Sequence, residues 1–174
     1  MAVEGSDGGL GAAFEAAIAA VVERILPSDD GTPGALETRA AHYVCAVAAN
    51  PSLRSLYSDG VARIDARAGE RFGRRFTELA GDQQDEILRA AEAGELGPGT
   101  SAFFELARVH TIEGSFGDPR HGGNAGMAGW KLVGYPGPRL EIGAHEQALD
   151  AASSGPMLSA AEIEPEIAAR TAAR

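Results

Sequence analysis

The sequence predicts an all-α fold, an irregular bundle of about five helices with a long Gly-rich loop and an acidic C-terminal tail. The first observation is composition, because 34 of the 174 residues are alanine, only 6% are aromatic, and β-branched runs are scarce. Alanine favours helices, whereas sheets are enriched in branched and aromatic side chains. The second observation is the helical spacing of apolar residues before the loop, and the third is an abrupt rise in glycine where the loop begins.

Five helices are predicted, in order, from apolar residues that recur at intervals of three and four. Proline and glycine, which interrupt helices, mark most of the boundaries between them. Phe72 and Phe76 bracket a short connector between the third and fourth helices, and no strand is predicted before residue 115. The predicted helices cover about residues 11–26, 35–50, 52–68, 82–93 and 100–113.

The segment from Gly114 to Pro138 differs from the rest of the chain, because 8 of its 25 residues are glycine. A Gly-rich segment without periodicity is normally a flexible linker. This one also contains Phe116, Tyr135 and the only tryptophan of the chain, Trp130. Such residues predict an ordered loop that packs on the helices, and ordered loops of this length are often functional.

The length favours one domain, since domains cluster at roughly 100–150 residues. The C-terminal segment is acidic and free of aromatic residues, with six Asp or Glu against two Arg between residues 140 and 174. Within it, Ser159-Ala160-Ala161-Glu162 fits a capping box that starts a short helix. We expect this tail to be mobile in isolation or to wrap a partner. The predicted parts are a disordered leader (1–9), a helical domain (10–138, with the loop at 114–138) and the tail (139–174).

The net charge of −10 and the isoelectric point near 4.8 argue against two classes of partner. An acidic chain lacks the basic surface that binds nucleic acid or an anionic membrane. No stretch approaches the 18 or so apolar residues of a membrane span. The first residues show neither a secretory signal nor a twin arginine, so a cytoplasmic location is expected for the sequence as written. A periplasmic location would follow if a twin-arginine leader had been removed or the complex were exported.

Four side chains near the end of the fifth predicted helix form a candidate reaction site: His110, Glu113, Asp118 and His121. Such groups bind Zn²⁺ or non-haem iron, and they also perform acid–base chemistry. Their spacing matches no established ligand signature, and a histidine at a helix end often bonds to the backbone instead. We therefore predict no catalytic, cofactor-binding or metal-binding residues, with this cluster as the alternative.

Three further features have an ordinary structural interpretation beside a functional one. The run Gly-Gly-Asn-Ala-Gly at 122–126 resembles a phosphate-binding loop, but a helix precedes it where that motif needs a strand. Asp29-Asp30 is a candidate carboxylate pair for acid–base chemistry or Ca²⁺, or else an ordinary turn. Cys45, the only cysteine, forms no internal disulfide and is either a buried, inert residue or a reactive thiol.

The aromatic residues of the Gly-rich loop predict a contact surface for a protein partner. Tryptophan and tyrosine are preferred anchors of protein interfaces, and Phe116, Trp130 and Tyr135 all lie within one loop. The alternative is that Trp130 and Phe116 complete the core of the chain itself. Spacing in the sequence does not choose between the two.

The order of glycine, aromatic and charged residues in and before this loop is distinctive. Several separated elements match in order over about residues 12–138, and together they resemble the gluconate 2-dehydrogenase subunit 3 family. Members of that family are small subunits of membrane-associated or periplasmic sugar and polyol dehydrogenases. The runs that carry the resemblance are TIEGSFGDPRHGGN (111–124), GWKLVGYPG (129–137), ILPSDD (25–30), Pro33-Gly34-Ala35, Phe72-Gly73 through Phe76, and Gln83-Gln84.

The resemblance implies a non-catalytic, chaperone-like accessory subunit of an oxidoreductase complex. The implied partner is a large FAD-containing subunit of the glucose–methanol–choline oxidoreductase type, which oxidises a sugar or polyol. Electrons would pass from it to a cytochrome c or another acceptor protein. FAD would belong to the partner of this heterodimer, with no cofactor in this chain. Small subunits of this family often supply a twin-arginine signal, and none is visible here.

The resemblance also selects loop residues that we expect to form or to support the contact with the partner. Two alternatives stay open, an independent carbohydrate-active enzyme that uses the four-residue cluster for metal-dependent or acid–base chemistry, and a chaperone that binds the flavoprotein only transiently. The expected contact set is Phe116, Arg120, His121, Asn124, Trp130 and Tyr135.

Overall fold

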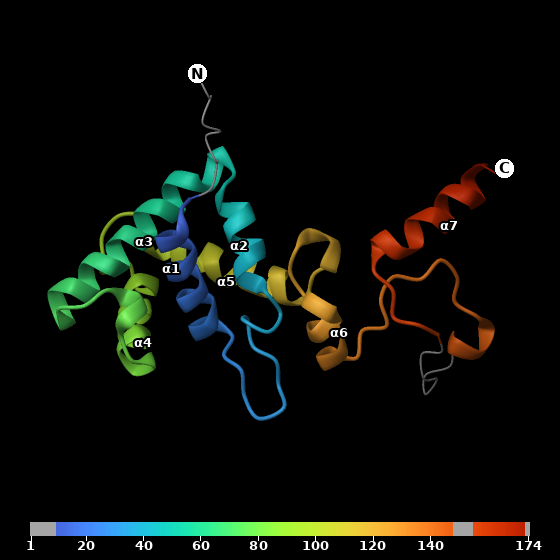
Figure 1. The fold of residues 1–174 in the computed structure, drawn as a ribbon, viewed down its shortest axis with the longest axis horizontal. Helices are drawn as coiled ribbons and strands as arrows, with labels where there is room; N and C mark the ends of the chain where they lie inside the picture. The colour runs from blue at the N-terminus through green and yellow to red at the C-terminus, as the bar shows by residue number, and fades with distance from the viewer. Residues whose placement is uncertain (1–9, 148–154, 173–174) are drawn as a thin grey trace, which may run out of the picture.

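The computed structural model describes residues 10–147 and 155–172, and over these ranges it confirms the all-α fold (Figure 1). The expected leader, residues 1–9, lies outside the described residues. Within them, an isolated bridge between Asp29 and Thr32 is the only β-type pairing, and no helix is both long and apolar enough to cross a bilayer. The α-helices described are α1 (Ala12–Ile25), α2 (Ala40–Ala48), α3 (Pro51–Phe72), α4 (Gly81–Glu92), α5 (Thr100–Phe116), α6 (Ala128–Val133) and α7 (Ala160–Ala172).

Helix α5 is the central element of the bundle, because it packs against α1, α2, α3 and α4. The core between these helices is mostly aliphatic, and two of its buried rings pack on each other. Tyr57 of α3 and Phe103 of α5 are fully buried and meet edge to face, with ring centroids 5.7 Å apart. Other fully buried side chains of this core are Ile18, Val21, Val22, Val44 and Ile64.

Two helix boundaries before α5 differ from those predicted. Helix α2 begins at Ala40 and not near residue 35, because a turn precedes it and Arg39 adopts the left-handed conformation with φ 58°. Helix α3 extends beyond residue 68 to Phe72, where Gly73 ends it with φ 68°. A left-handed glycine is a common helix terminator, since it pays no Cβ penalty.

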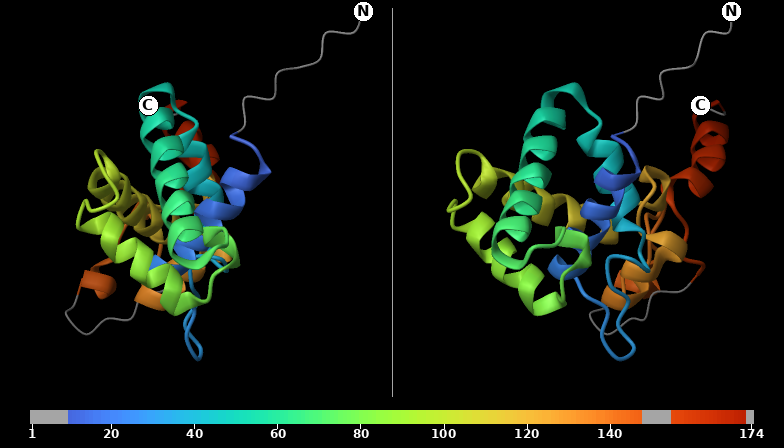
Figure 2. Two further views of the ribbon diagram at one scale, coloured as in Figure 1. Left: turned by 90° about the vertical axis from the view of Figure 1, so that its left-hand side faces the viewer. Right: turned by 60° about the vertical axis from the view of Figure 1, so that its left-hand side comes forward.

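The Gly-rich loop and the tail lie at the same end of the molecule. Helices α3 and α4 form the opposite end, while α6 and α7 lie beyond α2 and α5 (Figures 1 and 2). The loop joins α5 to α6, and the tail continues from α6 to α7. The helical body therefore supports the loop at one end, and the tail extends the molecule from there.

Gly60 is required where α3 crosses α5. A Cβ atom at position 60 would overlap the buried ring of Phe103, whereas one at Gly69 of the same helix would meet no atom within 4 Å. We predict that Gly60→Ala lowers the free energy of unfolding by about 1–3 kcal/mol through overpacking. The matched variant Gly69→Ala should raise it by up to about 1 kcal/mol, since alanine is the better helix former. Urea denaturation followed by circular dichroism measures both, and equal effects would contradict the described packing.

Candidate partner-binding surface

The segment predicted as one long loop contains more regular structure than its composition suggests. Helix α5 continues to Phe116, three residues beyond its predicted end. Two 3₁₀ turns follow, at Pro119–His121 and Ala125–Met127, and the second leads directly into α6. Helices this short leave no periodic signal, which is why the sequence pattern did not reveal them.

Hydrogen bonds of Asn124 hold this loop against the end of α5. It is fully buried and adopts φ 45°, a conformation that asparagine tolerates better than most residues. Its side chain donates to the carbonyl of Gly117 at 2.8 Å and accepts the N–H of Gly129 at 2.8 Å. Its own N–H donates to the carbonyl of Gly114 at 2.6 Å. One residue thus holds both ends of the loop against the helix.

The loop also passes so close to α5 that side chains would not fit between them. A Cβ atom on Gly123 would overlap the carbonyl of Gly114, and one on Gly129 would overlap the carbonyl of Ser115. Glycine is therefore needed at both positions for close backbone contact. The high glycine content produces a tightly packed segment here, in contrast to a flexible linker.

Trp130 is an internal residue of the loop. Only 4% of it is exposed, and its indole Nε1 donates to the carbonyl of Phe116 at 2.7 Å. The ring of Tyr135 meets it edge to face, with centroids 5.0 Å apart. Of the two interpretations of Trp130, the structure therefore favours the one in which it completes the chain's own packing, with Phe116 half-buried beside it.

Five of the six residues of the expected contact set divide into an inner and an outer group, and the sixth, Phe116, is half-buried between them in exposure. Asn124 and Trp130 are buried and support the surface from within. Tyr135 is 43% exposed, and Arg120 and His121 are exposed on the surface. Which of the six touch a partner stays a prediction.

Two exposed residues of α6 belong to this surface and were not in the expected set. Leu132 is 43% exposed and Val133 is 61% exposed. Their positions in the sequence could have identified them, because two consecutive apolar residues beside Trp130 on a short helix do not both face inward.

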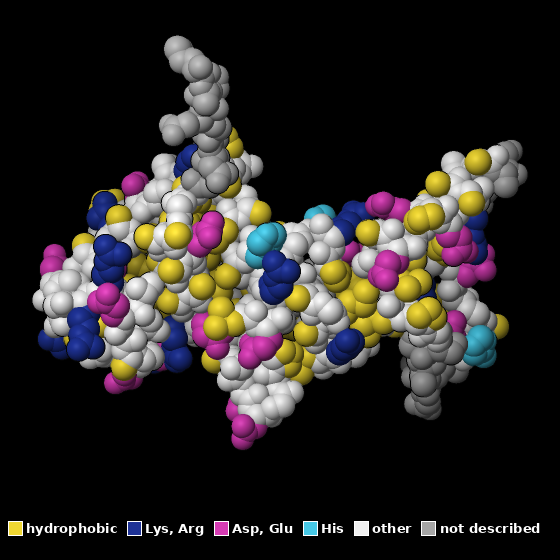
Figure 3. All heavy atoms as spheres, viewed as in Figure 1, with side chains coloured by type: hydrophobic (Ala, Val, Ile, Leu, Met, Phe, Trp, Pro, Cys, Tyr) yellow, Lys and Arg dark blue, Asp and Glu magenta, His cyan; other side chains and the backbone are white. Residues whose placement is uncertain are grey.

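A hollow of about 500 Å³ opens beside these exposed residues. Its walls are almost entirely apolar, with one carboxylate, Asp118, among them. Figure 3 shows hydrophobic side chains gathered in the region between α6 and the tail. The residues that line the hollow are Phe116, Asp118, Trp130, Val133, Tyr135, Pro138 and Ala160.

The tail forms the far wall of the hollow, because the start of α7 is held against the loop. The carboxylate of Asp118 accepts the N–H of Ala160 at 2.7 Å, and Arg120 pairs with Glu164 at 2.8 Å. Ile163 of α7 is 8% exposed. The carboxylate half of the predicted capping box is present as well. Glu162 accepts hydrogen bonds from both the N–H and the hydroxyl of Ser159, each at 2.7 Å.

Of the four residues considered as a reaction site, only His110 and Glu113 approach each other, with 4.0 Å between His110 Nε2 and the Glu113 carboxylate. His110 Nδ1 lies 2.7 Å from the hydroxyl of buried Tyr57, and the hydroxyl of Tyr43 donates to Glu113 at 3.0 Å. Burial raises the pKa of Tyr57 well above its ordinary value, so the phenol stays protonated. Asp118 bonds to backbone N–H groups, and His121 lies beside Arg120. In the described ranges no three His, Cys, Asp or Glu side chains are grouped so that they could hold a metal ion.

The carboxylate pair Asp29-Asp30 has the geometry of an ordinary turn. Asp29 accepts the N–H of Asp30 through its side chain at 2.7 Å, and its backbone pairs with Thr32 across the turn. The two backbone hydrogen bonds between Asp29 and Thr32 close a tight turn, and this turn accounts for the aspartates without a ligand.

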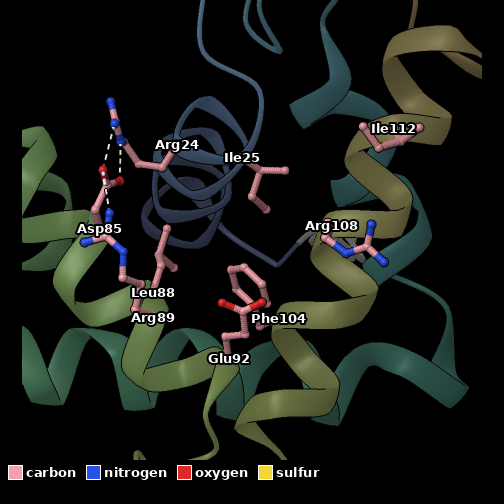
Figure 4. Close-up of a pocket in the computed structure, with 9 residues that line it drawn as sticks. All are labelled: Arg24, Ile25, Asp85, Leu88, Arg89, Glu92, Phe104, Arg108 and Ile112. Atoms are coloured by element: carbon pink, nitrogen blue, oxygen red, sulfur yellow. Dashed lines mark hydrogen bonds and ion pairs between the residues drawn. The ribbon is translucent and has the colours of Figure 1, made fainter.

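A second concave region, of about 450 Å³, lies on the body between α1, α4 and α5 (Figure 4). Arg24 donates to both carboxylate oxygens of Asp85, at 2.7 and 3.0 Å, which raises the pKa of the arginine and lowers that of the aspartate. Arg108 pairs likewise with Glu105. The apolar residues of this groove are Ile25, Leu88, Phe104 and Ile112.

The fold and the loop surface define a class of protein, a small all-helical domain that presents an apolar hollow of the kind that protein partners cover. Residues 12–137 match the family described as Gluconate 2-dehydrogenase subunit 3, and the chain belongs to this family. No curated protein and no solved structure matches the chain. Membership confirms the resemblance found in the sequence and identifies the chain as a subunit of a dehydrogenase. The match ends before the tail.

Asn124 offers a direct test of how the loop is held. We predict that Asn124→Ala detaches the loop from α5, because it removes both side-chain hydrogen bonds and leaves alanine at φ 45°. Trp130 is the only tryptophan, so its fluorescence emission should shift to longer wavelength while far-UV circular dichroism stays helical. His121→Ala, an exposed change in the same loop, is the control. Unchanged emission in Asn124→Ala would show that other contacts hold the loop.

The structure predicts that Cys45 is an inert thiol. Burial, together with the nearby charge of Glu15, raises its pKa to about 11. The thiolate is the reactive form, and at pH 8 it would amount to about one molecule in a thousand. Alkylation of the folded chain at pH 8 should therefore be far slower than that of the urea-unfolded chain, and should quicken as pH rises toward 11. Equal rates for the folded and unfolded chains would contradict this assignment.

Proposed function

We propose that this chain is a non-catalytic accessory subunit that binds and stabilises an FAD-dependent sugar or polyol dehydrogenase of the glucose–methanol–choline type. Family membership over residues 12–137 supports the assignment to a dehydrogenase complex. FAD belongs to the large subunit in this proposal, and this chain contributes contacts. Among the described residues, the four-residue cluster does not bring three ligands together, which favours this role over that of an independent metal-dependent enzyme.

The observation that carries the proposal is the exposed apolar surface of a tightly held loop. Leu132, Val133 and Tyr135 are all at least 43% exposed, and they lie beside an apolar hollow. Apolar side chains gathered on a rigid support are typical of surfaces that a protein partner covers. A preorganised surface also binds with a smaller loss of conformational entropy than a flexible one does.

The charge of the chain suits association with a basic region of the partner. At −10, it would steer a positively charged surface toward itself and raise the association rate more than the affinity. Electron transfer to a cytochrome c or another acceptor protein, in the cytoplasm or the periplasm, belongs to the large subunit in this proposal.

Co-expression with a large FAD-containing subunit of the proposed type tests the proposal. We predict a stable one-to-one complex on size exclusion, with flavin absorbance and dehydrogenase activity on a panel of sugars and polyols. Omission of this chain should remove most of that activity, because the large subunit would lack the contacts that stabilise it.

The control is the flavoprotein expressed alone at the same level. Full activity in that control, with this chain eluting separately, would contradict the proposal. A flavoprotein that needs co-expression but elutes without this chain would assign the transient chaperone role in its place.

A further inference from the structure

We propose that the hollow between the Gly-rich loop and the tail receives a segment of the partner dehydrogenase that carries an apolar side chain beside a lysine or arginine. The inference rests on the proposed function and adds the place of binding and the chemistry that is recognised there. It also gives the tail a part in the interface.

The hollow is a composite of two parts of the chain that are distant in sequence. Trp130, Val133 and Tyr135 form the loop side, while Pro138 and Ala160 come from the tail or its junction. The two sides are joined by the hydrogen bond from Ala160 to Asp118, whose residues are 42 positions apart. The hollow therefore exists because the tail is docked, and a bound segment would touch loop and tail together.

The walls determine the first requirement on the partner, an apolar side chain. Val133 is 61% exposed and Tyr135 is 43% exposed, and both line a hollow of about 500 Å³. A space of this size accommodates an aromatic or a branched aliphatic side chain. Burial of that side chain would remove apolar surface from water on both molecules, which stabilises the complex by roughly 25 cal/mol per Å².

The charges at the rim determine the second requirement, a basic side chain nearby. Asp118 lines the hollow, and the charge of Glu162 is close enough to be repelled by it. Both bond to backbone or hydroxyl groups, and among the described residues neither forms an ion pair. The N-terminus of α7 offsets only about half an elementary charge. Arg120 is already paired with Glu164, so an unneutralised negative charge stays beside the apolar walls.

The groove between α1, α4 and α5 is a weaker candidate for this partner. Its three arginines are paired within the chain, Arg24 and Arg89 with Asp85 and Arg108 with Glu105. The paired charges of the groove do not favour a basic partner over an acidic one, whereas the hollow combines apolar walls with net negative charge.

The test compares variants of the full chain by titration against the purified flavoprotein. Ala160→Phe fills the hollow from the tail side, and Val133→Ser removes apolar contact from the loop side. Each should weaken binding by about tenfold or more, since both act at the centre of the surface. Ala168→Phe, exposed on the same helix, and Leu36→Ser, 51% exposed on the body, are matched controls that should stay within about twofold.

Glu162→Gln tests the charge separately. One oxygen of Glu162 accepts both bonds from Ser159, so glutamine preserves the cap and removes the charge. Binding should weaken at low salt, and the difference from the wild type should shrink as salt screens the interaction. Glu95→Gln, an exposed change on the body, is the control for overall charge.

The outcomes separate this inference from the function on which it rests. If the wild-type chain binds the flavoprotein and both Ala160→Phe and Val133→Ser bind equally well, the inference is wrong and the accessory role stands. Absence of binding by the wild type would overturn both. If the chain alone dimerises and Ala160→Phe abolishes the dimer, the hollow receives a second copy of the chain, which would also overturn the inference.

Discussion

The buried side chain of Asn124 is the interaction on which the rest of the loop and tail depends. It holds the backbone at Gly117 and at Gly129, and its own N–H reaches Gly114. Buried polar groups are expensive to leave without partners, so these bonds select one arrangement of the segment. A segment that is one-third glycine gains a unique structure in this way, because the entropy of a flexible chain is offset by bonds at both of its ends.

The other features of the candidate site depend, one after another, on these hydrogen bonds of Asn124. With Gly129 held, α6 begins in place and Trp130 reaches the carbonyl of Phe116. Tyr135 then packs on the indole, which leaves the outer side of α6 exposed. Asp118, in the same loop, caps the first residue of α7 and docks the tail. The apolar hollow and its negative rim are therefore built on the loop that Asn124 holds in place.

The sequence was sufficient for the fold class and for the approximate positions of the helices in the body, because those depend on local spacing and on helix breakers. The sequence did not reveal where α2 begins, because Thr38, just before that helix, is bonded to Ser115, 77 residues away. The docking of the tail depends likewise on Asp118, and no local pattern in the tail reveals that contact. The capping box at Ser159 could be predicted because all of its bonds lie within four residues.

The contact set of the loop was only partly accessible from residue types. Trp130 and Asn124 were identified as important, but residue type does not distinguish a side chain that touches a partner from one that supports the surface. Burial distinguishes them, and it places both inside. Leu132 and Val133 were missed because a six-residue helix offers too few turns for a periodic pattern to assign its exposed side.

Hydrogen–deuterium exchange on this chain, free and in complex with the flavoprotein, tests the central claim most directly. We expect binding to slow exchange in residues 130–138 and at the start of α7, while α4 and the groove beside it exchange as in the free chain. Protection confined to α1, α4 and the middle of α5 would contradict it, because the partner would then cover the groove and leave the loop surface open.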